Sequence, residues 1–446
     1  MHWIALLPTE DERRAWACWA LRFTPRVTRQ SEALLLEITA SERLWGGRRA
    51  LLHSLLREHP FEQSVPWAQG GQALLALALL RLKAQGAERP AAVPDGLPLQ
   101  TLDAARAHVG TLARLGCRSW GALRALPRDG VARRFGDALL QALDCAYGER
   151  TDSHAWLQLP ERFDEKVELP ALATSAPELM WSTARLLARL QAWLQARQRG
   201  VLAFGLEWTL DLRRLDGVEL PRQQRLVIRT AQPTQDMAHL KRLAGEQLAR
   251  STLQAPANAL RLRALETAAW AGGDRSLLPH EGPQGERLHE LVERLSARLG
   301  PAQVLCSRPQ ADHRPEAMQH WVPAQGQTAA LLAASAAPRA GAPLPAAAAA
   351  ADALYPAWLL PAPLPLSVDR RGKPHHQGPL QLLSRPQRIE AVWWDGRQRP
   401  ALRDYFIAQS EAAGLLWIYR EHVGAHESTG QQAPAEYRWF LHGIYG

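Results

Sequence analysis

The sequence predicts a multidomain α+β protein, and three features of the chain carry this prediction. Near the N-terminus, a short apolar run at residues 33–39 is followed by a double-glycine turn and a helical pattern at residues 48–58, which is typical of a buried strand covered by a helix. Residues 162–268 show strand and helix patterns in the order β-α-β-β-α-β. Residues 355–446 contain short runs rich in Trp, Tyr and Ile between Gly and Pro, which indicate a small β-rich module.

The chain of 446 residues is long enough for roughly two to four domains, and it carries a formal net charge of +9. This basic balance favours a polyanionic partner, with nucleic acid ahead of a membrane surface. The four cysteines are widely spaced without a C-x-x-C pair, so neither a disulfide framework nor a zinc site is indicated. No signal peptide and no apolar run of membrane-spanning length is recognisable. We therefore expect a cytoplasmic protein that needs no metal or cofactor and contacts no membrane.

Residues 1–98 have the pattern of one small domain, and residues 99–151 are helical because leucines recur at helix-like intervals. Within the helical segment Gly116, Gly130 and Gly136 predict tight turns, and helix N-termini after such turns can offer N–H groups to phosphates. The elements expected in the first domain are strands at residues 1–8, 33–39 and 65–68 and helices at residues 48–58 and 72–83.

Residues 152–275 form the next expected domain, followed by a helical extension at residues 276–320 whose helix spans residues 285–299. Residues 321–354 are mostly Ala with Pro and Gly, which predicts a linker because such a segment lacks the apolar bulk of a core. Residues 355–446 are expected to be a protein-interaction module with aromatic anchors. In the domain at 152–275, strands are expected at residues 162–169, 201–212, 224–230 and 259–268 and helices at residues 176–198 and 236–251.

Two phrases near the N-terminus carry a family resemblance. L-R-F-T-P-R-V at residues 21–27 with L-L-L-E-I-T-A-S-E-R-L-W-G-G at residues 34–47 resembles the second palm block of the Y-family translesion DNA polymerases, and more narrowly the ImuB family of polymerase-like mutasome subunits. The phrase D-H-R-P-E at residues 312–316 and the C-terminal phrases W-W-D-G, R-D-Y-F and W-F-L-H-G-I-Y are also similar to the ImuB family. The resemblance implies a reduced Y-family palm over residues 1–98, a helical, helix-hairpin-helix-like thumb over 99–151 and a little finger over 152–275. It also implies that the fingers are largely absent.

The resemblance bears on catalysis through a few carboxylates. Glu32 falls where active Y-family enzymes carry the catalytic aspartate of this block, Ala33 falls on the glutamate that follows, and the first strand has no carboxylate. Two-metal phosphoryl transfer needs several carboxylates around ions about 4 Å apart. We therefore expect a non-catalytic pseudo-polymerase. The alternative is a degenerate but active polymerase that uses Glu32, Glu37 and Glu42.

Two groups of arginines are the candidate DNA contacts. In the thumb, arginines beside the turns would add positive charge to the backbone N–H groups that can bind phosphate. The strands at 201–212 and 224–230 partly alternate apolar and polar residues, so one face of this sheet can meet solvent or DNA. The resemblance implies that the little-finger sheet grips the DNA backbone without reading sequence. Surface arginines that contact only water are the alternative for both groups. The candidates are Arg128, Arg133 and Arg134 in the thumb and Arg213, Arg214, Arg222, Arg225 and Arg229 near the sheet.

The resemblance also implies protein partners: the β sliding clamp, an ImuA-type RecA-like accessory protein and an error-prone replicative-type DNA polymerase. Clamp peptides pair a glutamine with a Leu-x-Leu anchor, and the nearest match is Gln377 with Leu380 and Leu382; Leu364 and Leu366 form a second match without the glutamine. Either phrase can instead be a strand of the C-terminal module. The expected function is a DNA-binding and clamp-binding scaffold for damage-induced translesion synthesis and SOS mutagenesis at the bacterial nucleoid. A general DNA-binding protein unconnected with replication is the remaining alternative.

Overall fold

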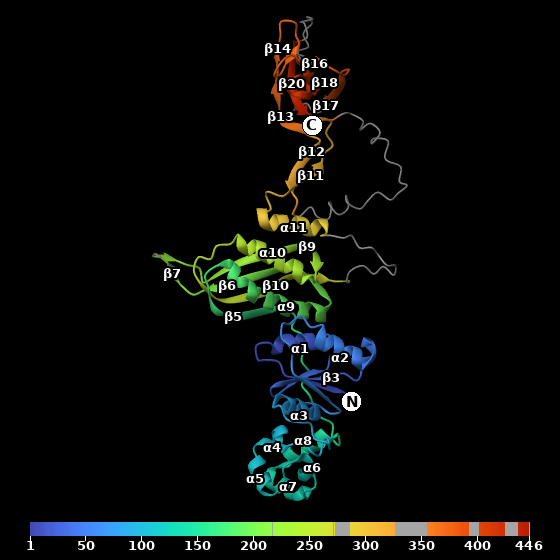
Figure 1. The fold of residues 1–446 in the computed structure, drawn as a ribbon, viewed down its shortest axis with the longest axis vertical. Helices are drawn as coiled ribbons and strands as arrows, with labels where there is room; N and C mark the ends of the chain where they lie inside the picture. The colour runs from blue at the N-terminus through green and yellow to red at the C-terminus, as the bar shows by residue number, and fades with distance from the viewer. Residues whose placement is uncertain are drawn as a thin grey trace. The chain divides into compact units, whose positions relative to one another are not determined.

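The computed structural model describes residues 1–215, 217–270, 272, 286–325, 355–391, 401–423 and 436–445. The chain divides into two compact units, Met1–Arg298 and Leu299–Gly446 (Figure 1). Strands and helices are mixed in the first unit, while the second is built mainly from strands, so the predicted α+β class is confirmed at this level. Among the described residues, no helix combines the length and apolar character needed to span a membrane.

The first unit begins with a four-stranded antiparallel sheet in the order β2-β3-β1-β4. Helices α1 and α2 cover one face, where Trp16 and Trp19 pack against Leu34 and Leu36, and helix α3 covers the other, against Leu35. Both faces are therefore buried, which is why β3 is a continuous apolar run and not an alternating one. The elements are β1 (Trp3–Leu6), α1 (Arg13–Leu21), β2 (Val27–Gln30), β3 (Ala33–Glu37), α2 (Arg48–Arg57), β4 (Trp67–Gly70) and α3 (Ala73–Ala84).

A bundle of short helices follows, and its core is centred on the buried Trp120. Gly116 and Gly136 have positive φ of +83° and +86° between successive helices, so the tight turns predicted at these two glycines are present. Gly130 was predicted to make a third turn, but it lies in the first turns of α7, because the flanking residues continue the helix. The bundle contains η2 (Leu99–Thr101), α4 (Asp103–Arg106), α5 (Val109–Arg114), α6 (Trp120–Arg124), α7 (Arg128–Phe135) and α8 (Asp137–Tyr147).

The remainder of the first unit is a four-stranded antiparallel sheet in the order β5-β10-β6-β9, with α9 and α10 packed on one face. Its element order matches the predicted β-α-β-β-α-β pattern, with a small β7–β8 hairpin inserted between β6 and β9. Helix α11 adds a buried ion pair, in which His239 Nε2 lies 2.7 Å from Glu293 Oε2. The elements are β5 (Asp164–Ala173), η3 (Ala176–Leu179), α9 (Met180–Arg197), β6 (Arg199–Leu210), β7 (Arg214–Leu215), β8 (Val218–Glu219), β9 (Gln223–Thr234), α10 (Met237–Ala249), β10 (Ala257–Ala269) and α11 (Leu288–Leu299).

The second unit is built on a sheet in the order β13-β20-β19-β18-β16, with β17 also paired to β18. One face packs Phe406 against Ile418 and Leu441, and the other packs Tyr405 against Trp417, so the β-rich character predicted for the C-terminal residues is confirmed. The elements are β11 (Leu305–Pro309), β12 (Gln319–Pro323), β13 (Trp358–Pro365), β14 (Ser367–Val368), β15 (Pro374–His375), β16 (Gln381–Leu382), β17 (Gln387–Ala391), β18 (Ala401–Ser410), β19 (Gly414–Val423) and β20 (Glu436–Ile444).

The helical extension predicted at residues 276–320 is helical only in α11. Beyond it, β11 and β12 form an antiparallel hairpin, and β12 reaches into the stretch predicted to be a linker. Glu316, in the connection between these strands, forms an ion pair with Arg403 of β18 at 2.8 Å. This contact explains part of the D-H-R-P-E phrase, whose glutamate belongs to the second unit. The rest of the predicted linker, residues 326–354, and the W-W-D-G phrase lie outside the described residues.

Candidate nucleic-acid interface

Helices α9 and α10 pack on one face of the sheet β5-β10-β6-β9, and the strands present a second set of side chains on the opposite face. Side chains alternate along its strands, so Leu226 and Ile228 of β9 point to the core, whereas Arg225, Val227 and Arg229 point away from it. We call this second face the open sheet face. Its charged members are Asp164, Lys166 and Glu168 of β5, Glu207 of β6, Arg225 and Arg229 of β9, and Arg261, Arg263 and Glu266 of β10.

Glu207 lies at the centre of the open sheet face, and its side chain is only 8% exposed. It is the register partner of Arg261 on one side and of Arg225 on the other. Its carboxylate is 3.6 Å from Arg225 Nε and 3.8 Å from Arg261 Nη1, and it accepts a short hydrogen bond from Arg263 Nη2. One buried carboxylate therefore contacts three guanidinium groups from two neighbouring strands.

Asp164 is the second carboxylate in this group. Arg261 Nε donates to its Oδ1 at 2.6 Å, and hydrogen bonds from Arg261 hold the pKa of Asp164 below its ordinary value. The group thus contains two carboxyl groups, Asp164 and Glu207, among three arginines, and Lys166 stands in register with Arg261. The excess is positive, which suits an anionic ligand.

The structure brings together only two of the predicted sheet arginines. Arg225 and Arg229 both lie on the open sheet face, and Arg229 Nη1 is paired with Glu266 at 3.0 Å. Arg213 and Arg214 belong instead to the β7–β8 hairpin region, which projects from the sheet (Figure 1), and Arg214 lies 3.7 Å from Glu219 across that hairpin. Arg222 is exposed just before β9.

Sequence reasoning missed Lys166, Arg261 and Arg263, which share the face with Arg225. The alternation Leu260-Arg261-Leu262-Arg263 within an expected strand was the available indication, because it places both arginines on one side of the sheet. The assignment of this side to the face opposite the helices required the burial of Leu260 and Leu262.

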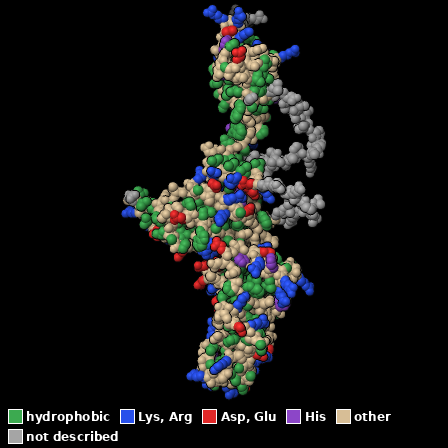
Figure 2. Space-filling view, viewed as in Figure 1, with side chains coloured by type: hydrophobic (Ala, Val, Ile, Leu, Met, Phe, Trp, Pro, Cys, Tyr) green, Lys and Arg blue, Asp and Glu red, His purple; other side chains and the backbone are tan. Residues whose placement is uncertain are grey.

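The predicted thumb arginines are placed less favourably for binding phosphates. Arg128 makes two hydrogen bonds to Asp144, at 2.8 and 2.7 Å. Arg133 and Arg134 are exposed, but they lie in the last turn of α7, away from its N–H groups. Acidic residues also occupy the first turns of α7 and α8, where they compete with a phosphate for the positive end of the helix. Figure 2 shows Lys and Arg side chains interspersed with Asp and Glu over the face in view, without one large basic field.

The three glutamates of the alternative polymerase site do not converge. Arg81 donates to Glu32 at 2.7 Å and is paired with Asp103 at 2.7 Å, and hydrogen bonds from Arg81 lower the pKa of Glu32. Glu37, at the other end of β3, is paired with Arg26 at 2.9 Å, and five residues of strand correspond to roughly 16 Å. Glu42 lies 2.6 Å from His2. In the described part of the chain no three His, Cys, Asp or Glu side chains gather as a metal site would require.

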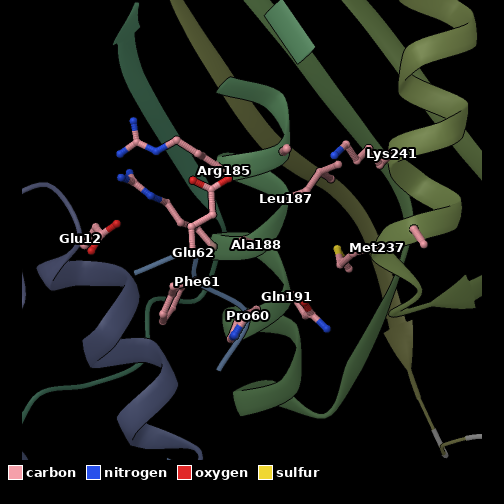
Figure 3. A pocket seen from close by; sticks show the side chains of 13 residues that line it. Glu12, Pro60, Phe61, Glu62, Arg185, Leu187, Ala188, Gln191, Met237 and Lys241 are labelled. Carbon is pink, nitrogen blue, oxygen red and sulfur yellow. The ribbon is translucent and has the colours of Figure 1, made fainter. Parts of the chain in front are cut away.

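A pocket of about 280 Å³ lies elsewhere in the first unit, between the loop at Phe61 and helices α9 and α10 (Figure 3). Its floor is formed by apolar side chains such as Leu187, and charged side chains, including Glu62 and Arg185, stand around it. None of the thirteen residues drawn around it is a Ser, Cys or His that could supply a nucleophile with its base. Its lining therefore does not have the composition of a site that uses a Ser or Cys nucleophile with a His base.

The predicted clamp phrase is a strand of the second unit. Leu380 is 5% exposed and packs in the core with Phe406 and Leu441, while Leu382 is 42% exposed in β16 and pairs with Ala408. Gln377 precedes them in a turn with φ of +50°. In the second candidate phrase, Leu364 is exposed on the edge strand β13 and Leu366 packs against the same core as Leu380.

Comparison with known proteins adds relatives along almost the whole chain. No family model matches it. Protein ImuB of Caulobacter vibrioides, strain NA1000 / CB15N, is 27% identical over 471 aligned residues, which cover 96% of this chain and 92% of the relative, and Protein ImuB of strain ATCC 19089 matches equally.

Among solved structures, a Dbh ternary complex matches with 12% identity and a TM-score of 0.26 over 57% of this chain and 78% of that chain. DinB from Sulfolobus solfataricus matches with 12% identity and a TM-score of 0.24 over 59% and 78%. These superpositions are too loose to carry an argument, whereas the sequence similarity extends nearly from end to end. This chain is therefore similar to Protein ImuB over nearly all of its length.

Proposed function

We propose that this protein is a non-catalytic homologue of the Y-family polymerases that binds DNA and acts as a scaffold in damage-induced translesion synthesis. The observation that carries the proposal is the surroundings of Glu32, which stands at the family's catalytic position. Its carboxylate is hydrogen bonded to Arg81, and its neighbour Ala33 is buried under α3. A guanidinium group in this place neutralises the carboxylate that a metal ion would need.

DNA binding is supported by the open sheet face. Arg225, Arg261 and Arg263 present guanidinium groups on one side of a rigid sheet, and arginine is suited to bidentate contacts with phosphate. The backbone phosphates are the same in every DNA sequence, so such a face positions a protein on DNA without selecting a base. Each phosphate neutralised would change the slope of log K against log salt concentration by about −0.9 on duplex DNA.

The protein partners belong to the same proposal and rest on the similarity to ImuB. They are the β sliding clamp, an ImuA-type accessory protein and an error-prone polymerase that performs the synthesis, at the bacterial nucleoid. Leu382 and Leu364 are the exposed leucines of the two clamp phrases. In the folded protein, each phrase would therefore contact the clamp through this leucine. A clamp that needed Leu380 would have to release it from the core.

The decisive experiment is primer extension on undamaged and abasic templates with Mg²⁺ and with Mn²⁺, run beside a gel shift with primer–template DNA at several salt concentrations. We expect salt-sensitive binding without nucleotide incorporation. Incorporation that survives purification and disappears in Glu32→Ala would overturn the non-catalytic assignment. Co-purification of the clamp separates a replication-linked scaffold from a general DNA-binding protein.

A further inference from the structure

Glu207 is an unexpected residue for a face that binds phosphate. A carboxylate repels an anionic ligand, and this one stands at the centre of the open sheet face with three arginines around it. Its side chain is nearly buried, so it is not a solvated acid at the rim. Its position therefore calls for a role other than contact with the ligand.

The geometry of the strands supplies that role. Arg261 and Arg263 are two residues apart on β10, roughly 7 Å along the strand, and Arg225 lies across β6 from them. Three like charges at this spacing repel each other, and long arginine side chains lose considerable rotamer freedom when they are held in place. Glu207 lies between the two strands and offsets the repulsion, because its two oxygens together face all three guanidinium groups. The same contacts restrict the arginine rotamers before a ligand binds, so less rotamer freedom is lost on binding.

The arginines keep donors available after they have contacted Glu207. A guanidinium group carries five N–H donors, and the contacts with Glu207 engage one nitrogen of each arginine, while Asp164 also engages Nε and Nη2 of Arg261. The Nε–H of Arg263 makes no hydrogen bond within the described residues, but it is itself buried and is not among the donors that an anion in solvent can reach. Arg225, Arg261 and Arg263 are all about one-third to one-half exposed, so their remaining donors can reach an anion in solvent.

We propose that Glu207 is a positioning residue that holds Arg225, Arg261 and Arg263 in the arrangement that binds the phosphates of DNA. This inference rests on the proposed DNA-binding function and adds to it the residue that organises the site. For the loss of Glu207, this proposal predicts the opposite change in DNA affinity from the one that net charge alone predicts. Removal of a negative charge from a DNA-binding face tightens binding when only net charge matters, whereas loss of a positioning residue weakens it.

The test is the affinity of the full chain for a fluorescent primer–template duplex, measured by anisotropy at several salt concentrations. Glu207→Gln is expected to weaken binding roughly five- to tenfold. Glu168→Gln is the matched control, because Glu168 lies exposed on the same face and in register with Ala259, with no arginine contact in the described structure. It is expected to bind DNA as tightly as the unchanged protein or more tightly.

A double-mutant cycle separates positioning from a general structural effect. Arg263→Ala alone is expected to weaken binding, and adding Glu207→Gln to it is expected to cost less than Glu207→Gln costs in the unchanged protein, because one of the positioned groups is already gone. If Glu207→Gln fails to fold, the DNA affinity of Glu207→Asp is the test, because this substitution keeps the negative charge but shortens the side chain that contacts the arginines. Affinity equal to or tighter than the unchanged protein in the folded Glu207 variant would overturn the proposal. Absence of salt-sensitive binding by the unchanged protein would instead reject the DNA-binding function itself.

Discussion

His442 is the residue whose surroundings depart most from those of a histidine in water. It is fully buried, its Nδ1 is 2.9 Å from the Tyr405 hydroxyl, and its Nε2 lies 3.6 Å from Glu316 without a hydrogen bond. Burial lowers the pKa of His442 to about 4 and outweighs the opposing effect of Glu316. The ring is therefore neutral in the folded protein at pH 7.

This neutral histidine predicts a specific loss of stability in acid. Between about pH 6.5 and pH 4 the unfolded state binds a proton at His442 that the folded state does not, so the unfolding free energy falls as pH falls through this window, by up to about 3 kcal/mol. Urea unfolding of the full chain at pH 7 and pH 4.5 measures the change. His442→Phe should reduce the pH dependence, and His313→Gln, at an exposed position, should leave it unchanged. An equal pH dependence in His442→Phe would contradict the assignment.

At the scale of elements, a core leucine directly before β16 and an exposed leucine within it lie only two residues apart. Leu380→Ala removes a core side chain beside Phe406 and Leu441, and we expect it to lower the unfolding free energy by about 2 to 4 kcal/mol. Leu382→Ala removes a half-exposed side chain and should cost less than about 1 kcal/mol. Chemical denaturation checks both values. In a clamp-binding assay, only Leu382→Ala gives an interpretable loss, and clamp binding that survives this substitution would exclude Leu382 as the anchor.

Elements with a strong local pattern were predictable, and elements fixed by distant partners were not. The run at β3 and the leucine spacing of α9 both identify their elements because burial imposes a period on the sequence. The β11–β12 hairpin lacks such a period, because most of its side chains are exposed. The hairpin is held by the Glu316–Arg403 pair, which joins residues 87 positions apart. A local sequence pattern cannot indicate a contact between residues so distant in the chain.

The candidate site was predictable only where a pattern within one strand indicated it. Alternation along β9 placed Arg225 and Arg229 on one face, but the strand order β5-β10-β6-β9 brings β10 beside β6 and thereby adds Arg261 and Arg263. A sequence shows which residues alternate within a strand and leaves open which strands are neighbours. Glu207 therefore became recognisable as a central residue only once its two neighbouring strands were known.

At the scale of the whole molecule, the second unit begins well before the aromatic phrases of its sequence. Leu299–Gly446 is one compact unit, and Arg403 is tied to Glu316 and to Glu421. We predict that a fragment of residues 299–446 unfolds cooperatively in urea and that one of residues 355–446 is less stable by at least about 2 kcal/mol, because it leaves the largely buried Arg403 without Glu316. Glu316→Gln in the longer fragment isolates the ion pair and should account for part of the difference. Equal stability of the two fragments would show that the hairpin contributes nothing.

The burial of Ala33 has a consequence for the history of this chain. Ala33 is completely buried against Ala73, Ala76 and Leu77 of α3, at the position that the sequence resemblance aligns with a glutamate of active Y-family enzymes. A glutamate introduced here would place a charge in that apolar contact, at a cost of several kcal/mol, a large share of the stability of a typical domain. A single substitution of this kind would therefore be selected against through the stability of the fold. The packing of α3 acts as an evolutionary constraint, which keeps a small apolar residue at position 33.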